Sequence, residues 1–324
     1  MMSSRRVVTL LAVALVVAAV ALWLPGRRAA APAAQVGSLV LPGLKTGLDA
    51  VRSVRLESHG AGVTLVRGEA GWSVEERHYP ADPVKLRKLL LGLAELKVVE
   101  EKTSDPSNYA RLGVEDPGPE AASVRVEAKT PSASYDLLVG KVADNRSSYV
   151  RVPGTATSLL ASPQVAVDAD PKRWIDATLV DLPADRIESV AVWPATGPAW
   201  HATRAAATDG LTLQDLPKGK TQRSAGIVTP VAAMLTGLHI EDVANAPDAA
   251  PAGPHVELRT FDGVVIELHG RSDGDKRYIR GSARSTGEAT ASEAAALESR
   301  LAGREFEVLR YKYDALFRPL ADFT

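Results

Sequence analysis

The sequence predicts an α+β protein, in which one N-terminal transmembrane helix precedes two similar strand-hairpin, helix and strand units with mainly antiparallel sheets. Three observations indicate this class. An apolar run without charged residues opens the chain, short alternating apolar runs separated by glycine-containing turns follow it, and one order of features occurs twice. The 324 residues suffice for one anchor and about two domains, and 45% of them are apolar, which provides for a sizeable core.

The first element is the apolar run from Val7 to Leu24, which follows Arg5 and Arg6. At about 1.5 Å per residue its 18 positions span roughly 27 Å, close to the hydrocarbon core of a bilayer. Pro25 ends the helix, so residues 1–25 are predicted to be a single-pass anchor. The very short N-terminal tail favours a cytoplasmic N-terminus. We therefore expect the bulk of the chain on the periplasmic side of the inner (cytoplasmic) membrane.

Two alternatives compete with the anchor. A cleaved signal peptide would use the small residues Ala29–Ala31, but its apolar region is usually about 7–15 residues and this run is longer. A buried core helix is the other alternative, although the run has no polar face to make it amphipathic. Residues 26–48 are rich in Ala, Pro and Gly and are predicted to be a tether between the membrane and the folded part.

Residues 49–182 are predicted to form the first α+β unit. Alternating runs between Val51 and Val74 predict a hairpin-rich opening. A helix is expected after Asp82 and Pro83, which suit the N-cap and the first helical position. Four leucines then recur at i, i+3, i+4 and i+7 as one apolar stripe: Leu86, Leu89, Leu90 and Leu93. Strands are expected near residues 98–99, 124–126, 135–139 and 149–152. Short helices are expected at the polar residues that precede a proline: Asp105, Ser162 and Asp170.

Residues 183–324 are predicted to be a second, duplicated α+β unit. Five segment pairs occur in the same order in both halves: 49–56 with 185–192, 71–74 with 210–213, the helix and the strand that follows it up to Glu100 with 229–244, 124–130 with 256–262, and 149–152 with 278–281. Two unrelated α+β segments with common capping chemistry are the alternative. A helix near 292–302 is expected, with Thr290 and Glu293 at capping-box spacing and Gly303 as its stop. Residues 306–317 are expected to return to the sheet as a strand.

Composition and motifs exclude several functions. The net charge of −1 gives no electrostatic reason to expect nucleic acid. The absence of cysteine excludes disulfides, thiolate metal sites, cysteine nucleophiles and an acylated cysteine. Neither a Gly-x-Ser-x-Gly elbow nor a phosphate-binding loop ending in Lys-Ser or Lys-Thr is present. The sequence therefore predicts a non-enzymatic protein without catalytic or cofactor-binding residues, and it identifies no small-molecule ligand.

Two pairs of polar residues are candidate metal ligands. Glu267 and His269 lie two apart on a predicted strand and share a face, so they would bind zinc only with two further ligands. An exposed polar sheet face explains them equally well. Asp168 and Asp170 form an Asp-x-Asp pair, in which helix capping by Asp170 is the expected role. The loop 273–275 is expected to be a hairpin turn. No metal site is predicted.

Tryptophans are the candidates for an aromatic sugar platform. Trp72 and Trp193 lie in apolar alternating runs, where core packing is the default, and Trp174 is also expected to pack. Trp200, beside His201, is the tryptophan predicted to be exposed.

Four stretches carry a family resemblance: residues 51–74, 81–101, 108–117 and 135–154. They resemble the DUF4340 family over about residues 49–180, and the second half resembles it more loosely. The resemblance implies an N-terminal membrane helix followed by repeated α+β units. It also implies association with ABC-transporter components related to gliding-motility and auxiliary export systems. It supplies no enzymatic residues.

These observations together predict a membrane-anchored, extracytoplasmic accessory or scaffold protein, which works beside integral membrane subunits of an ABC-transporter-type envelope complex. The anchor would raise its local concentration near such a partner. A polysaccharide-binding protein or hydrolase of the cell envelope is the alternative, and it predicts a cleft with clustered carboxylates and an exposed Trp200. A purely structural spacer is the third possibility.

Overall fold

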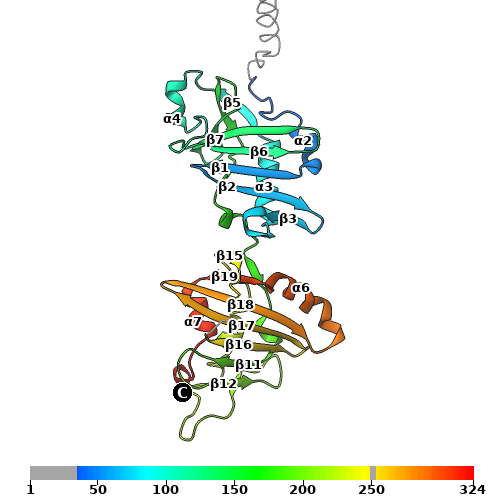
Figure 1. The fold of residues 1–324 in the computed structure, drawn as a ribbon, viewed down its shortest axis with the longest axis vertical. Helices are drawn as coiled ribbons and strands as arrows, with labels where there is room; N and C mark the ends of the chain where they lie inside the picture. Colours follow the sequence, from blue (N-terminus) through cyan, green and yellow to red (C-terminus); the bar gives the residue numbers. More distant parts are fainter. Residues whose placement is uncertain (1–34, 249–252) are drawn as a thin grey trace, which may run out of the picture. The chain divides into compact units, whose positions relative to one another are not determined.

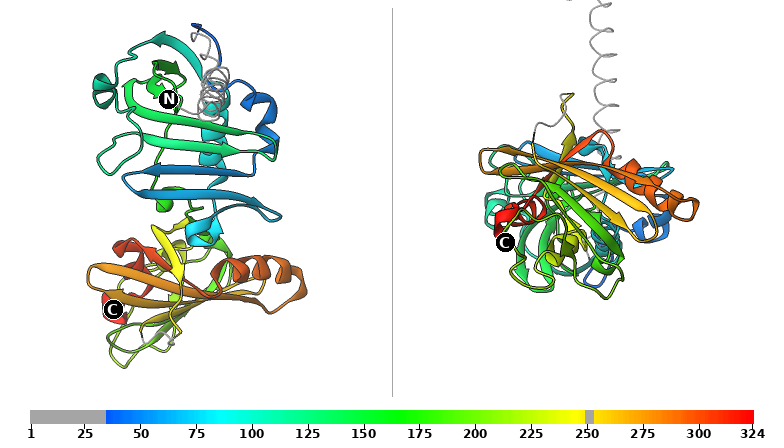
Figure 2. Two further views of the ribbon diagram at one scale, coloured as in Figure 1. Left: turned by 45° about the horizontal axis from the view of Figure 1, so that its top comes forward. Right: turned by 90° about the horizontal axis from the view of Figure 1, so that it is seen from below.

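The computed structural model describes residues 35–248 and 253–324. These residues form two compact units, the first containing the chain up to Gly62 with Arg87–Ala169, and the second containing Val63–Leu86 with Asp170–Thr324. The long segment of the second unit begins at Asp170, before the expected boundary between residues 182 and 183, and Val63–Leu86 also groups with this unit. The predicted class is observed in its main part: antiparallel sheets dominate and helices are few (Figures 1 and 2).

The first sheet has nine strands in the order β4-β3-β2-β1-β6-β7-β8-β9-β5. Its strands are β1 (Ser53–Ser58), β2 (Ala61–Gly68), β3 (Gly71–Val74), β4 (Tyr79–Pro80), β5 (Lys97–Glu101), β6 (Val124–Lys129), β7 (Ser134–Asp144), β8 (Ser147–Arg151) and β9 (Ser158–Ser162). Helix α3 (Pro83–Ala94) precedes β5, and α4 (Tyr109–Leu112) follows it.

The second sheet has eight strands in the order β13-β12-β11-β16-β17-β18-β19-β15. They are β11 (Ile187–Trp193), β12 (Trp200–Thr203), β13 (Thr212–Leu213), β15 (Asp242–Asn245), β16 (His255–Thr260), β17 (Val264–Asp273), β18 (Lys276–Ser285) and β19 (Arg304–Val308). The helices of this region are α5 (Thr229–Ala233), α6 (Ala291–Leu301) and α7 (Arg310–Leu316). A separate two-stranded sheet pairs β10 (Thr178–Val180) with β14 (Leu238–His239).

The two large sheets repeat one strand order. Reading β3-β2-β1-β6-β7-β8-β9-β5 beside β13-β12-β11-β16-β17-β18-β19-β15 matches every strand with a counterpart in the same chain order. Neighbouring strands also pair in the same way, since β1 pairs antiparallel with β6 in the first sheet and β11 pairs antiparallel with β16 in the second. The same order of eight strands supports the duplication that the segment pairs predict.

Most of the expected caps form. The Asp82 carboxylate accepts hydrogen bonds from the backbone N–H groups of Val84 (2.9 Å) and Lys85 (3.0 Å) at the start of α3. Asp105 and Asp170 cap short 3₁₀ turns in the same way. The leucine stripe of α3 is buried, as its spacing predicts. The turn at residues 273–275 is a hairpin turn between β17 and β18, with Gly274 at φ 55°.

Three local expectations were wrong. The spacing of Val231, Met234, Leu235 and Leu238 at i, i+3, i+4 and i+7 predicts a second-unit helix through Leu238. However, α5 ends at Ala233, and Gly237 at φ 59° leads the chain into β14. No helix follows Ser162, whose peptide bond to Pro163 is cis. The last segment is a strand only through Val308 and then becomes helix α7.

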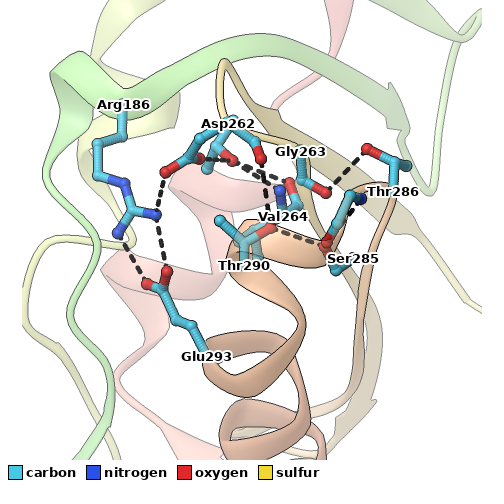
Figure 3. A network of polar contacts seen from close by, with 10 residues as sticks. Arg186, Asp262, Gly263, Val264, Ser285, Thr286, Thr290 and Glu293 are labelled. Carbon is cyan, nitrogen blue, oxygen red and sulfur yellow. Dashed lines mark hydrogen bonds and ion pairs between the residues drawn. The ribbon is translucent and has the colours of Figure 1, made fainter.

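The expected capping box at the start of α6 is replaced by a wider polar network (Figure 3). Glu293 pairs with the Arg186 guanidinium at 2.7 Å and 2.9 Å, while Arg186 also contacts Asp262 at 2.7 Å. The Thr290 hydroxyl contacts Ser285 (2.7 Å) and the Asp262 carbonyl (3.2 Å) instead of capping the helix. The network therefore fixes α6 to the start of β11 and to the β16–β17 turn.

Part of the expected tether is folded. Residues 37–38 form backbone hydrogen bonds with Val98 of β5. The Gly37 N–H donates to the Val98 carbonyl (2.8 Å), and the Val98 N–H donates to the Ser38 carbonyl (2.9 Å). Val40 and Leu44 are buried, so the segment covers the edge of β5 and adds to the core of the first unit. Residues 26–34 of the tether lie outside the described residues.

The predicted anchor, residues 1–25, also lies outside the described residues. Within residues 35–248 and 253–324, every helix is too short or too polar to cross a bilayer.

Candidate binding face of the second sheet

The second sheet has one face covered by helices and one open face. Leu268 and Gly270 point to the covered face, where a Cβ on Gly270 would lie 2.6 Å from the ring of Phe317 next to α7. A Cβ on Gly281, the strand partner of Leu268, would lie 3.1 Å from Leu301 of α6. Both helices therefore pack on the same face, since side chains alternate along a strand. The opposite face of β11, β16, β17 and β18 is the candidate binding face.

A row of stacked rings crosses this open face. Trp193 pairs with His255 across β11 and β16, and His255 pairs with His269 across β16 and β17. The indole stacks on the His255 ring with 4.2 Å between centroids and 12° between planes, and His255 stacks on His269 at 5.3 Å and 25°. We call these three residues the stacked row. The row is fixed in orientation, since each ring rests on the next.

Ion pairs surround the stacked row. His269 Nε2 lies 2.9 Å from Glu267 Oε1, and Arg284 Nη2 lies 2.9 Å from Glu257 Oε2. The carboxylate of Glu305, only 6% exposed, accepts from Arg271 (3.0 and 2.6 Å) and from Arg280 (3.1 Å). The charges of the face are thus largely neutralised by its own residues.

The local environment shifts the pKa values of two of these groups, His255 and Glu305. Burial lowers the pKa of His255 below its ordinary 6.5, a positive charge on His269 lowers it further, and Glu267 acts in the opposite direction. Burial alone would raise the pKa of Glu305, but hydrogen bonds from Arg271 and Arg280 outweigh it and lower that pKa below 4.5. His255 is therefore held neutral and Glu305 is held ionised near pH 7.

Two tryptophans, Trp200 and Trp193, differ from the expected exposure. Trp200 is buried, donates its indole N–H to the Arg318 carbonyl at 2.8 Å and packs edge-on against Phe323, so its predicted exposure was wrong. Trp193, expected in the core, is 41% exposed. The two-residue period of a strand explains the exposure of Trp193, because Val190 and Val192 face the core and thereby place Trp193 on the other face. Trp200 is the strand partner of Val192 and shares its buried face. Trp174 is buried as expected, and Trp72 is half-buried.

Glu267 and His269 share the open face, as their spacing predicts. The structure adds His255 as a neighbour that sequence spacing alone did not reveal. Within the described ranges, however, no three His, Asp or Glu side chains converge as metal ligands. The two further ligands that zinc would need are not brought together there.

A cavity of the second unit lies between residues 76–78 and 242–245. Its carboxylate, Asp242, accepts from Arg77 at 2.7 Å and pairs with Lys172 at 3.3 Å. Burial would raise the pKa of Asp242, but hydrogen bonds from Arg77 and the Val243 backbone lower it. A carboxylate held ionised by two cations is poorly suited to donate protons.

The first sheet shows what the fold itself requires at the position of the stacked row. In the second sheet, Trp193 and His255 follow the buried pair of Val192 and Val256. In the first sheet, the pair that follows the buried Leu56 and Val126 in the same way is Glu57 and Arg125. Arg125 there forms an ion pair with Asp136 at 2.5 Å. The stacked row is therefore a property of the second sheet and is not needed to build this fold.

A family model described as a domain of unknown function (DUF4340) matches residues 72–255, more than half of the chain. The chain belongs to the DUF4340 family. No curated protein and no solved structure matches it. In this DUF4340 protein the matched region begins in β3 and ends at the first residue of β16, so it includes parts of both sheets. It contains Trp193 and His255 and stops before His269.

Proposed function

We propose that this DUF4340 protein is a non-enzymatic accessory protein, held at the inner membrane by residues 7–24 with its folded part outside the cytoplasm. Its partners in this proposal are integral membrane subunits of an ABC-transporter-type envelope complex. The open face of the second sheet is its ligand-binding surface. Family membership, the N-terminal apolar run and the ion-paired character of the open face support the proposal.

One observation carries it: the chain is integrated into the first unit from Gly37 onward. Residues 25–36 are then all that separates the apolar run from folded structure. Twelve residues reach at most roughly 40 Å when fully extended. Such a short connection keeps the first unit beside the bilayer, which suits a partner embedded in the same membrane better than a distant envelope layer.

Crosslinking in native membranes tests the proposal, and the cysteine-free chain makes single-site crosslinking clean. Val99 of β5 is 42% exposed and directly follows Val98, which pairs with the N-terminal segment. We expect Val99→Cys in the full chain to crosslink to an integral membrane transporter subunit. Val142→Cys, at another exposed valine of the first unit, is the matched control.

The second arm replaces Val7–Leu24 with a cleavable signal sequence. The crosslink should then disappear while the folded part is still exported. Recovery of a soluble chain that lacks its N-terminus, or of no integral membrane protein in either arm, would refute the accessory function.

A polysaccharide-binding protein remains a second candidate, because Trp193 is exposed on the open face. The hydrolase version has less support. Glu257 and Glu267 are strand partners on that face, but each is engaged, Glu257 with Arg284 and Glu267 with His269. A glycosidase needs one carboxyl kept protonated beside one kept ionised.

A further inference from the structure

The stacked row has unmet hydrogen-bonding capacity. Among the described residues, neither the Trp193 indole N–H nor the ring nitrogens of His255 have a hydrogen-bond partner. Trp193 is 41% exposed, although one face of its indole is covered by His255. An exposed aromatic surface next to free polar atoms suits a ligand that is apolar on one side and hydroxylated at its edge.

The charges around the row indicate an uncharged ligand. The charged groups near it are engaged by other side chains: Glu257 pairs with Arg284 and Arg259, and Glu305 pairs with Arg271 and Arg280. The Glu267 carboxylate lies 2.9 Å from His269 Nε2. No unpaired cation of the described face is left to attract a phosphate or an acidic sugar. His255, held neutral, offers both a donor and an acceptor.

The first sheet serves as an internal comparison. Its matching positions, Glu57 and Arg125, are charged, and Arg125 is paired with Asp136. The same architecture thus folds with ordinary surface charges at these positions. The rings of the second sheet are not required for packing, so they are available for recognition.

We propose that the stacked row binds a sugar ring of an uncharged glycan chain. The C–H face of the sugar would stack on the exposed part of the Trp193 indole. Its hydroxyl groups would hydrogen-bond to the Trp193 N–H and to the His255 ring nitrogens. This ligand assignment rests on the proposed extracytoplasmic location, where such glycans are accessible.

The test uses the full chain in detergent micelles with three neutral oligosaccharides: cellohexaose, maltohexaose and hexa-N-acetylchitohexaose. Saturation-transfer difference NMR should show transfer to at least one of them. Trp193→Ala should raise the dissociation constant by about tenfold or more, and His255→Leu should also raise it. Tyr311→Ala, at a tyrosine that is 61% exposed in α7, should bind like the unaltered chain.

Three outcomes overturn this assignment. The first is that none of the three oligosaccharides shows saturation transfer, and the second is that Trp193→Ala binds them as tightly as the unaltered chain does. The third is that Trp193→Ala abolishes the Val99→Cys crosslink to a membrane protein, which would make the row a protein-docking surface. Thermal unfolding of each variant verifies that it is folded. The outcome is separable from the accessory function, because the Val99→Cys crosslink tests that function on the first unit without oligosaccharide.

Discussion

At the scale of single residues, His255 is the most direct reporter of the stacked row. Burial lowers its pKa below 6.5, and the positive charge that His269 acquires on protonation lowers it further. We expect the His255 Hε1 resonance to titrate below pH 6.5. His269→Gln should move that midpoint upward but leave it below 6.5, because burial is the larger cause. A midpoint at or above 6.5 in the unaltered chain would mean that the rings are not stacked as described.

Glu305 provides a stability test on the same face. Its buried carboxylate accepts from Arg271 and Arg280, so Glu305→Gln should lower the free energy of unfolding by about 2 kcal/mol near pH 7. The pKa of Glu305 is lower in the folded state than its ordinary 4.5. Its contribution is therefore complete above pH 4.5 and is lost as the pH falls through the folded-state pKa.

Urea unfolding at pH 7 and at pH 3 measures this difference. Glu307→Gln, two residues along β19 in a more exposed pair with Lys276, is the matched control and should cost much less. An equal loss in both variants at pH 7 would show that the buried pair has no special role.

At the scale of elements, the N-terminal segment is the piece whose contribution differs most from expectation. Leu44 is fully buried in the first unit, whereas Val36, just before the paired residues, is 73% exposed. We expect Leu44→Ala to destabilise the first unit by about 3 kcal/mol, because it leaves a cavity in the core. Val36→Ala should leave the stability nearly unchanged. Equal stability of both variants in thermal unfolding would show that this segment is a tether after all.

Elements with strong local signals were predictable. The Asp82-Pro83 cap and the leucine stripe predict α3 because both are set by neighbours within one or two helical turns. The tether prediction failed for residues 37–44 because their structure comes from pairing with β5, more than fifty residues away. The capping box at Thr290 failed for a similar reason, since Arg186 competes for Glu293.

At the scale of the whole molecule, the occurrence of one strand order in both sheets was predictable from the repeated segments, and the stacked row was not. Trp193 and His255 lie far apart in sequence and meet only because β11 pairs with β16. Alternation along β11 already contained the signal that Trp193 faces away from the core, since Val190 and Val192 occupy the buried positions. Its ring partner required the register, which spacing along one strand does not contain.

The connection between the proposed anchor and the folded part can be tested by lengthening it. Inserting about 30 Gly and Ser residues after Arg28 extends the maximum reach by roughly 100 Å. If proximity to a membrane partner depends on the native 12-residue connection between Leu24 and Gly37, the insertion should lower the effective concentration of the first unit at that partner about sixfold. The yield of the Val99→Cys crosslink should fall with it, while thermal unfolding of the folded part stays unchanged. An insertion of equal length in the β12–β13 loop is the control, because it adds the same mass without lengthening the connection before the first unit. An unchanged yield after the Arg28 insertion would mean that the partner is recruited by affinity alone, and the short connection would then have no part in the function.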